Sequence, residues 1–459
     1  MRKTRSRTTM VLLIALLVVI GICVFIVKMF MNSSQWIQHT YNGHLSGNGG
    51  LASAGTIYDR HGTVLAYSED NLRLYNSDLI TRLSTMHVVG DDSLNVSSAI
   101  QSSYRSNLTG YNCILGLGLP KSIKTGSDIT LNLDAEACNA AYNALDGYNG
   151  AVAVYNYKTG EFICSVSTPT YDPLDPPDIT EENEAEYDGV YVDKVLAGRY
   201  APGSTFKIVT AAAALENIPG IEEEIFTCNG STKIGGKDIT CMHVHGELTM
   251  KEGLAQSCNV VFAELAHRLG KDKMTDMAKR MGFNDTYKIN GTVTAKSSYN
   301  VSAANDNDLG WSGIGQYTVE ANPLQMAIMC GAIANNGDVV IPNEIKRGIG
   351  VVESAADNTS GKKLIDAELA QKLDEYMRYD VTSYYGDDLF PTLTVCAKTG
   401  TAEVGEGREP HAWMVGYSKD EDAPLAFAVI VENGGYGYST AGPVAVAAME
   451  ACAAVLRNE

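Results

Sequence analysis

Three apolar stretches near the C-terminus decide the fold: TVCAKTGTAEV at residues 394–404, HAWMVGYS at 411–418 and LAFAVIVEN at 425–433. Each has the length and the β-branched and aromatic content of a strand, and short polar segments separate them. An alanine-rich stretch, GPVAVAAMEACAAVLRNE, follows at 442–459. We therefore predict three consecutive strands and a closing helix.

A second pair of strands lies much earlier in the chain. AVAVYN at 151–156 and EFICSVS at 161–167 flank the turn residues 157–160, which indicates a hairpin. Strands at both ends with helices between them predict an α+β domain, in which helices flank an antiparallel sheet. The intervening helices are expected after Gly203, after Ser257 and around 323–335.

The N-terminal part has shorter periodic stretches and more polar and glycine residues than the main domain. GTIYDRHGTVLA at 55–66 reads as a hairpin with a His-Gly turn, and residues 67–128 mix short periodic stretches with Ser, Asn and Gly. Residues 32–54 are polar and rich in glycine, as in a flexible stalk. We expect a cytoplasmic tail at 1–9, a membrane anchor at 10–31, a stalk and small pedestal domain at 32–128, and the main domain at 129–459.

The expected anchor is an uncharged apolar run of 18 residues from Met10 to Val27. A helix of that length spans about 27 Å, close to the hydrocarbon thickness of a bilayer. Four bases precede it, which places the N-terminus in the cytoplasm and the rest of the chain outside the cell membrane. A cleaved signal peptide is the alternative, but the run exceeds a signal core and no small-residue cleavage site follows Lys28.

The charge balance excludes one class of partner. The 459 residues carry 35 Lys and Arg against 54 Asp and Glu, a net charge of −19. A surface that binds nucleic acid needs a basic footprint, so we expect no nucleic-acid partner.

The first chemical motif is Ser204-Thr205-Phe206-Lys207. Pro202 and Gly203 precede it and a strong helical stretch follows, so Ser204 and Lys207 share one face of a helix start. A lysine whose pKa is lowered by burial can take the proton of a serine nucleophile. The same spacing recurs at Ser360 and Lys363, where glycine and adjacent lysines indicate a solvated turn.

The second motif is Ser257-Cys258-Asn259, between two apolar helical stretches. In that place the Ser257 hydroxyl can relay a proton and the Asn259 amide can hold a substrate amide. A plain helix cap is the alternative.

The third motif is Lys398-Thr399-Gly400-Thr401, inside the first of the late strands. Lys398 and Gly400 face one side of that strand, so the cation can meet a substrate carboxylate while Gly400 leaves room for an extended substrate. The backbone N–H groups of Thr401 and Ser204 would complete an oxyanion hole.

The order of these three motifs resembles the class B penicillin-binding proteins, the monofunctional peptidoglycan D,D-transpeptidases. GTIYDRHGTVLA (55–66), STPTYDPL (167–174) and HAWMVGY (411–417) are similar to further segments of that family. The resemblance implies a penicillin-binding, serine β-lactamase-like transpeptidase domain on a small pedestal domain, and a role in the cell wall and in cell shape.

The resemblance also implies a role for each residue. Ser204 would attack the carbonyl between the terminal D-alanines of a stem peptide, and β-lactam antibiotics would acylate the same serine. Lys207 would be the base and Ser257 the proton shuttle. Lys398, Thr399 and Thr401 would bind the substrate carboxylate. No cofactor and no catalytic metal are implied.

The resemblance leaves other functions open. A D,D-carboxypeptidase, a β-lactamase or a β-lactam sensor shares the motifs, and an inactive scaffold is a further alternative. The residues before 129 are too few for a glycosyltransferase domain, so the expected partner is a polytopic membrane glycosyltransferase. The sequence decides neither between elongation, division and sporulation nor which amine accepts the cross-link.

Ten cysteines are many for an exported protein. Cys228 and Cys241 flank a glycine-rich, hairpin-like stretch and are candidates for a disulfide. The alternative is a zinc site formed by Cys241, His243, His245 and Cys258, although their spacing fits no standard zinc motif.

Overall fold

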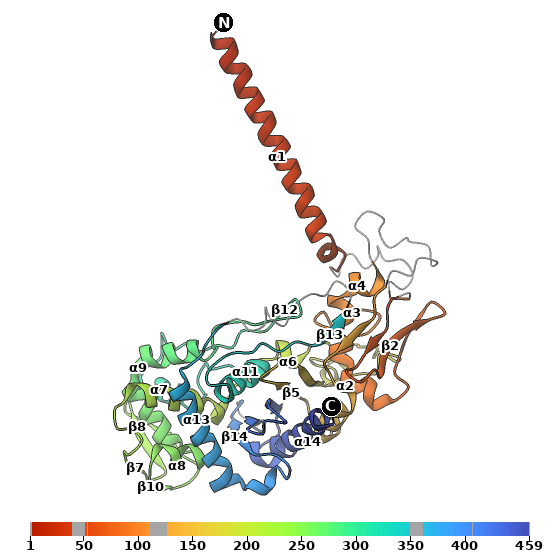
Figure 1. Ribbon diagram of the computed structural model, residues 1–459. Helices are drawn as coiled ribbons and strands as arrows, with labels where there is room; N and C mark the ends of the chain where they lie inside the picture. The colour runs from red at the N-terminus through yellow and green to blue at the C-terminus, as the bar shows by residue number, and fades with distance from the viewer. Residues whose placement is uncertain are drawn as a thin grey trace.

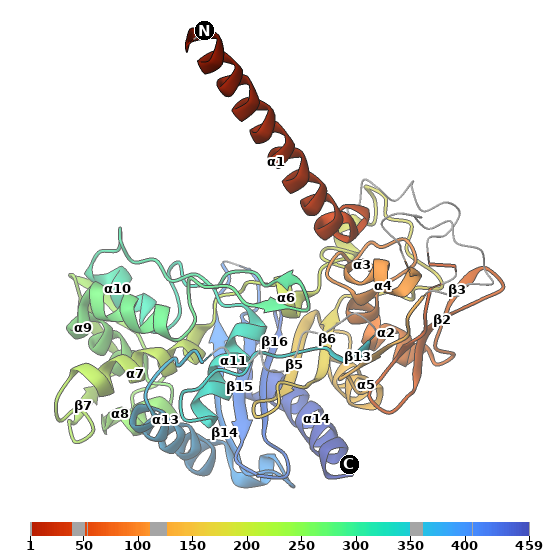
Figure 2. The same cartoon turned by 45° about the horizontal axis from the view of Figure 1, so that its top comes forward.

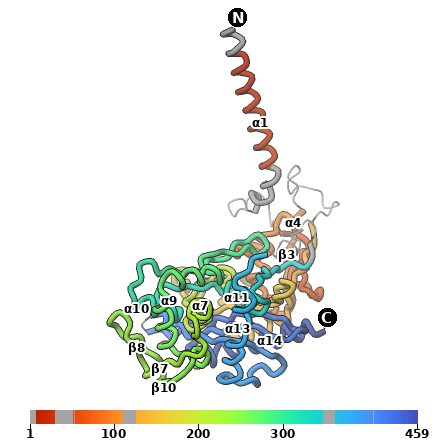
Figure 3. Tube along the Cα trace, turned by 60° about the vertical axis from the view of Figure 1, so that its left-hand side comes forward, coloured from red at the N-terminus to blue at the C-terminus, as the bar shows by residue number. Residues whose placement is uncertain are grey.

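The computed structural model describes residues 2–38, 51–52, 54–110, 126–348, 361–405 and 407–458. Most of the expected stalk, Cys113 and Ser360 lie outside these residues. Helix α1 (Arg2–Gln38) projects away from the rest of the described chain (Figure 1, Figure 3). Its apolar part, 23 residues from Arg7 to Met29, is not buried by any other described part of the chain. It is long enough to cross a bilayer. This fits the predicted membrane anchor.

The main domain is built on a five-stranded antiparallel sheet in the order β14-β15-β16-β5-β6. The late strands and the early hairpin meet where β16 pairs with β5, for example Ala428 opposite Ala153. The predicted α+β sheet is therefore confirmed. The strands are β5 (Gly150–Asn156), β6 (Phe162–Thr168), β14 (Val395–Ala402), β15 (His411–Ser418) and β16 (Leu425–Val431).

Helices cover both faces of this sheet, so its strands read as continuous apolar runs (Figure 2). Trp413 and Val415 pack in the core shared with α11 (Pro323–Ala334), whereas Ala412 and Met414 pack in the core shared with α14 (Gly437–Arg457). Helix α14 is apolar and long enough to span a membrane, but 44% of its apolar window is buried. It is thus a core helix of the folded domain. Helix α5 (Ala135–Ala144) packs beside it.

A helical region lies beyond strand β14 and carries the first two motifs. A 3-10 turn, Gly203–Phe206, leads into α7, and α8 precedes α9, as the sequence predicts. Two small two-stranded sheets lie against α9: β7 pairs with β10, and β8 and β9, which lie between them in the sequence, form a hairpin. The elements are α7 (Lys207–Asn217), α8 (Met250–Ala255), α9 (Asn259–Arg280), α10 (Asp306–Ser312), α13 (Ala367–Asp380), β7 (Phe226–Cys228), β8 (Ser231–Ile234), β9 (Lys237–Thr240) and β10 (Gly246–Leu248).

The second sheet has the order β13-β4-β1-β2-β3 and lies near the base of α1 (Figure 1). The predicted hairpin is present as β1 and β2. The division at residue 129 stays a prediction, because β4 and β13 join this sheet from beyond it. The elements are β1 (Ile57–Tyr58), β2 (Val64–Glu69), β3 (Leu72–Tyr75), β4 (Ile129–Leu131), β13 (Ile345–Gly348), α2 (Leu79–Val89), α3 (Ile100–Ser103) and α4 (Arg105–Thr109). Short elements elsewhere are α6 (Lys194–Ala197), β11 (Lys288–Ile289) and β12 (Thr292–Val293).

Candidate active site

Ser204 stands in the 3-10 turn that is pressed against strand β14. Gly203 has a φ of +53°, and a Cβ there would lie 2.5 Å from the Thr401 carbonyl oxygen. Only glycine satisfies both the left-handed backbone and this close approach. Trp413 of β15 donates from Nε1 to the Ala201 carbonyl at 3.0 Å and holds the start of the turn. The sheet therefore fixes the position of Ser204.

Lys207 is the first residue of α7, and its side chain is fully buried. Its Nζ lies 3.0 Å from Ser204 Oγ and 3.1 Å from Ser257 Oγ. It also donates to the Ser257 carbonyl at 2.6 Å and to Asn259 Oδ1 at 2.8 Å. The first two motifs of the sequence thus converge on one amine.

Burial lowers the pKa of Lys207 to about 7, and the positive charge of Lys398 acts in the same direction. The neutral amine is therefore well populated near neutral pH. In that form Nζ can accept the Ser204 hydroxyl proton across the 3.0 Å contact, which makes Ser204 a nucleophile.

Ser257 occupies the junction between α8 and α9 with a φ of +56°, a conformation that non-glycine residues rarely adopt. This backbone directs its hydroxyl between two lysines, at 3.1 Å from Lys207 Nζ and 3.3 Å from Lys398 Nζ. Asn259 is held by donating from Nδ2 to the Thr240 carbonyl at 3.0 Å. The arrangement is suited to a proton relay that includes Ser257.

Lys398 is buried on β14, where Nζ also donates to the Thr399 carbonyl at 3.0 Å. Burial lowers the pKa of Lys398, and the nearby Asp380 carboxyl opposes this effect. Thr399 and Thr401, on the same strand, line the pocket beside Ser204.

Gly400 requires a correction. We expected its missing side chain to make room for an extended substrate. A Cβ there would instead meet the Pro202 carbonyl oxygen at 2.8 Å and Thr205 Cγ2 at 2.9 Å. Glycine is therefore needed because the Ser204 turn docks on the strand at this point.

The pocket beside Ser204 has a volume of about 370 Å³. Five of the residues that line it come from the three sequence motifs, namely Ser204, Ser257, Asn259, Thr399 and Thr401. Aromatic side chains contribute to its walls, namely Trp311, Tyr384, Tyr436 and Tyr438.

Two residues of this site were not found from the sequence. Tyr385 accepts the Thr399 backbone N–H at 3.0 Å and lies 2.9 Å from Thr399 Oγ1, so it orients that side chain. Asp380 is fully buried, and its carboxylate oxygens have no hydrogen-bond partner among the described residues. Burial raises its pKa, whereas Lys398 and Lys207 lower it. Asp380 is the last residue of α13, and Tyr385 ends the irregular turn Val381–Tyr385 that follows it, a segment with no recognisable sequence signal.

Comparison with known proteins identifies a family for this chain. The family model described as "Penicillin binding protein transpeptidase domain" matches residues 150–450. The peptidoglycan D,D-transpeptidase PbpA of Mycolicibacterium smegmatis is 29% identical over 70% of this chain and 70% of its own length. Penicillin-binding protein 3 of Bacillus subtilis is 28% identical over 68% of this chain, but the alignment spans only 49% of that relative.

Solved structures show the same fold. Penicillin-binding protein A from Mycobacterium tuberculosis, as an imipenem acyl-enzyme complex, superposes with a TM-score of 0.74 at 25% identity over 89% of this chain and all of the other. The D,D-transpeptidase domain from Eggerthella lenta superposes with a TM-score of 0.71 at 27% identity, over 87% of this chain and 98% of the other.

Proposed function

Because this chain belongs to the class B penicillin-binding proteins, the family of peptidoglycan D,D-transpeptidases, we propose that Ser204 is the nucleophile of an acyl-transfer reaction. The observation that supports this best is the contact of 3.0 Å between Ser204 Oγ and a buried lysine amine. Penicillin and related β-lactams would acylate the same oxygen; the mycobacterial relative forms an acyl-enzyme with imipenem.

The proposed reaction has two halves. Ser204 Oγ attacks the carbonyl carbon of the penultimate D-alanine while Lys207 Nζ takes the hydroxyl proton. The peptide C–N bond breaks, and the departing D-alanine amine receives a proton through the Ser257 hydroxyl. An amine of a neighbouring stem peptide then attacks the ester carbonyl, gives up its proton by the same route, and frees Ser204. The amide that results is the cross-link.

Substrate binding is proposed to depend on a local charge. The net charge of the chain is −19, yet the D-alanine terminus is an anion. We assign its carboxylate to the hydroxyls of Thr399 and Thr401, with Lys398 supplying positive charge behind them. Tyr385 keeps Thr399 in place for this contact.

The test is to locate the acyl group and follow its fate. The detergent-solubilised full chain is treated with penicillin, digested and sequenced by mass spectrometry. We expect one adduct, on the peptide that ends at Lys207 and contains Ser204. A stem pentapeptide with an acceptor amine should then release D-alanine and give a cross-linked product. An adduct elsewhere would overturn the assignment of Ser204, and hydrolysis with no cross-link would favour a D,D-carboxypeptidase.

Acylation is expected to depend on pH through Lys207. Its pKa lies near 7 instead of its ordinary 10.5, because burial and Lys398 disfavour the cation. The base is the neutral amine, so the second-order acylation rate should rise about tenfold per pH unit below pH 7 and level off above it. Stopped-flow measurement with a fluorescent penicillin between about pH 5.5 and 8.5 checks this prediction. A rate that is flat below pH 7 would contradict the role of Lys207 as base.

Helix α1 has a membrane role in the proposed function. We propose that it anchors the chain with its N-terminus in the cytoplasm, because the bases of residues 2–7 precede the apolar part. The exposed apolar surface of α1 and the sheet at its base would contact a polytopic membrane glycosyltransferase that polymerises the glycan. Co-purification of that partner should be lost when residues 10–31 are exchanged for an unrelated membrane helix.

A further inference from the structure

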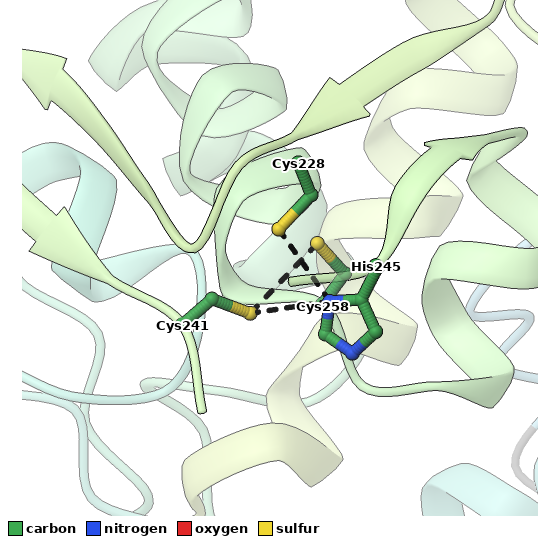
Figure 4. A group of neighbouring side chains, drawn as sticks. All are labelled: Cys228, Cys241, His245 and Cys258. Atoms are coloured by element: carbon green, nitrogen blue, oxygen red, sulfur yellow. Dashed lines mark hydrogen bonds between the residues drawn. The ribbon is translucent and has the colours of Figure 1, made fainter. Parts of the chain in front are cut away.

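Beside Ser257, four side chains of residue types that can ligate a metal lie close together, each from a different segment (Figure 4). Cys228 ends strand β7, Cys241 follows β9, His245 precedes β10, and Cys258 is the residue before α9. Their sulfur and nitrogen atoms all lie within 4.8 Å of one another. The pairing of β7 with β10 and of β8 with β9 brings these segments together.

The distances in this cluster exclude disulfides. The Sγ atoms of Cys241 and Cys258 are 3.9 Å apart, against about 2.05 Å in a disulfide. The nine cysteines in the described part of the chain are all free thiols. The candidate disulfide between Cys228 and Cys241 is therefore absent.

The same distances match the edges of a tetrahedron around zinc. With zinc–sulfur bonds of about 2.3 Å and zinc–nitrogen bonds of about 2.0 Å, tetrahedral ligands lie about 3.8 Å apart for two sulfurs and about 3.5 Å for sulfur and nitrogen. Cys228 Sγ and Cys241 Sγ each lie 3.5 Å from His245 Nδ1, and the Cys241–Cys258 distance is 3.9 Å.

A hydrogen bond to one sulfur supports the same conclusion. The backbone N–H of Asn259 donates to Cys241 Sγ at 3.2 Å, at the N-terminus of the 22-residue helix α9. Such N–H groups stabilise the anionic sulfur that a metal ion requires.

We propose that Cys228, Cys241, His245 and Cys258 bind one zinc ion. Three thiolates and one imidazole in a closed tetrahedron are typical of a structural zinc site. The zinc set expected from the sequence needs one correction. His243 is exposed, with its ring centre 6.2 Å from that of His245, and Cys228 takes its place.

The position of the zinc site indicates that the ion orders the Ser257 junction of the active site. This role rests on the proposed function. Cys258 lies between Ser257 and Asn259, both of which contact Lys207 Nζ. A zinc ion bound to Cys258 and Cys241 would fix this junction and hold Ser257 in its unfavourable backbone conformation. The ion would thus position the proton relay, and two of its ligands, Cys241 and His245, also line the pocket beside Ser204.

The test begins with metal content. The full chain is purified in detergent with metal-free buffers and analysed by plasma mass spectrometry, where we expect about one zinc per chain. His245→Ala should lower the content at least fivefold, whereas the neighbouring His243→Ala should keep it. Cobalt exchanged into the native chain should give the thiolate charge-transfer bands and intense visible bands of a tetrahedral site. No metal, a different metal, or retention of zinc in His245→Ala would overturn the proposal.

A second measurement uses only the native chain, in case a variant fails to fold. Cys228, Cys241 and Cys258 should resist alkylation until a chelator removes the ion, as read by peptide mass spectrometry. Removal should also slow penicillin acylation at least about tenfold, as loss of a positioning group does. Unchanged alkylation would overturn the site. Loss of zinc with undiminished acylation would overturn its positioning role alone, and bound zinc in a chain that penicillin never acylates would refute the proposed function alone.

Discussion

The Ser204→Ala variant is expected to form no acyl-enzyme with a fluorescent penicillin, with labelling below about 1% of the native level, because the nucleophilic oxygen is gone. No neighbouring group replaces it in this geometry. The other hydroxyl in contact with the same amine, Ser257 Oγ, is held between Lys207 and Lys398. Cross-link formation should be lost together with labelling.

The folded state should survive this substitution. Ser204 is half-buried, and its hydroxyl gives up one contact with Lys207, whose amine keeps Ser257 and Asn259 as partners. We expect a change in unfolding free energy within about 1 kcal/mol. Ser302→Ala, at an exposed serine outside the pocket, is the matched control and should label as the native chain does. Labelling of Ser204→Ala near the level of that control would remove Ser204 from the mechanism and leave the scaffold function open.

Local patterns in the sequence predicted most of the architecture. The five strands of the main sheet are apolar runs bounded by turn residues, and helices on both faces explain why those runs do not alternate. Strands β4 and β13 could not be assigned to the smaller sheet in this way. They have only three and four residues, and β13 pairs with a strand more than 200 residues earlier.

In the candidate site, too, local sequence patterns predicted some residues and long-range packing placed the others. Ser204, Lys207, Ser257 and Lys398 were found because each occurs in a short motif with a fixed backbone context. Tyr385 and Asp380 reach the site through the tertiary packing at the end of α13. No motif of fixed residue spacing in the sequence identifies them. The two misjudged details, the reason for Gly400 and the exchange of His243 for Cys228, both depend on close approach between segments distant in sequence.

Replacing Lys207 is expected to have the second large effect. In Lys207→Met the base is lost, and the acylation rate should fall at least about 10³-fold, within the range measured for general-base removal. Lys207→Arg should be equally slow, since guanidinium keeps the charge but cannot lose its proton in a protein. The two variants together separate proton transfer from electrostatics, because a purely electrostatic role would let arginine restore the rate.

A matched control separates chemistry from stability. Removal of Lys207 leaves the Ser257 carbonyl and Asn259 Oδ1 without their donor, at a cost of about 1–3 kcal/mol for each buried group. Lys194, another buried lysine, pairs with Glu432 at 2.5 Å and has no contact with Ser204, so Lys194→Met should destabilise the fold but still acylate. In Lys207→Ala, added methylamine should restore part of the rate, and more so at higher pH, where the amine is neutral. Acylation of Lys207→Met within tenfold of the native rate would show that another group takes the Ser204 proton.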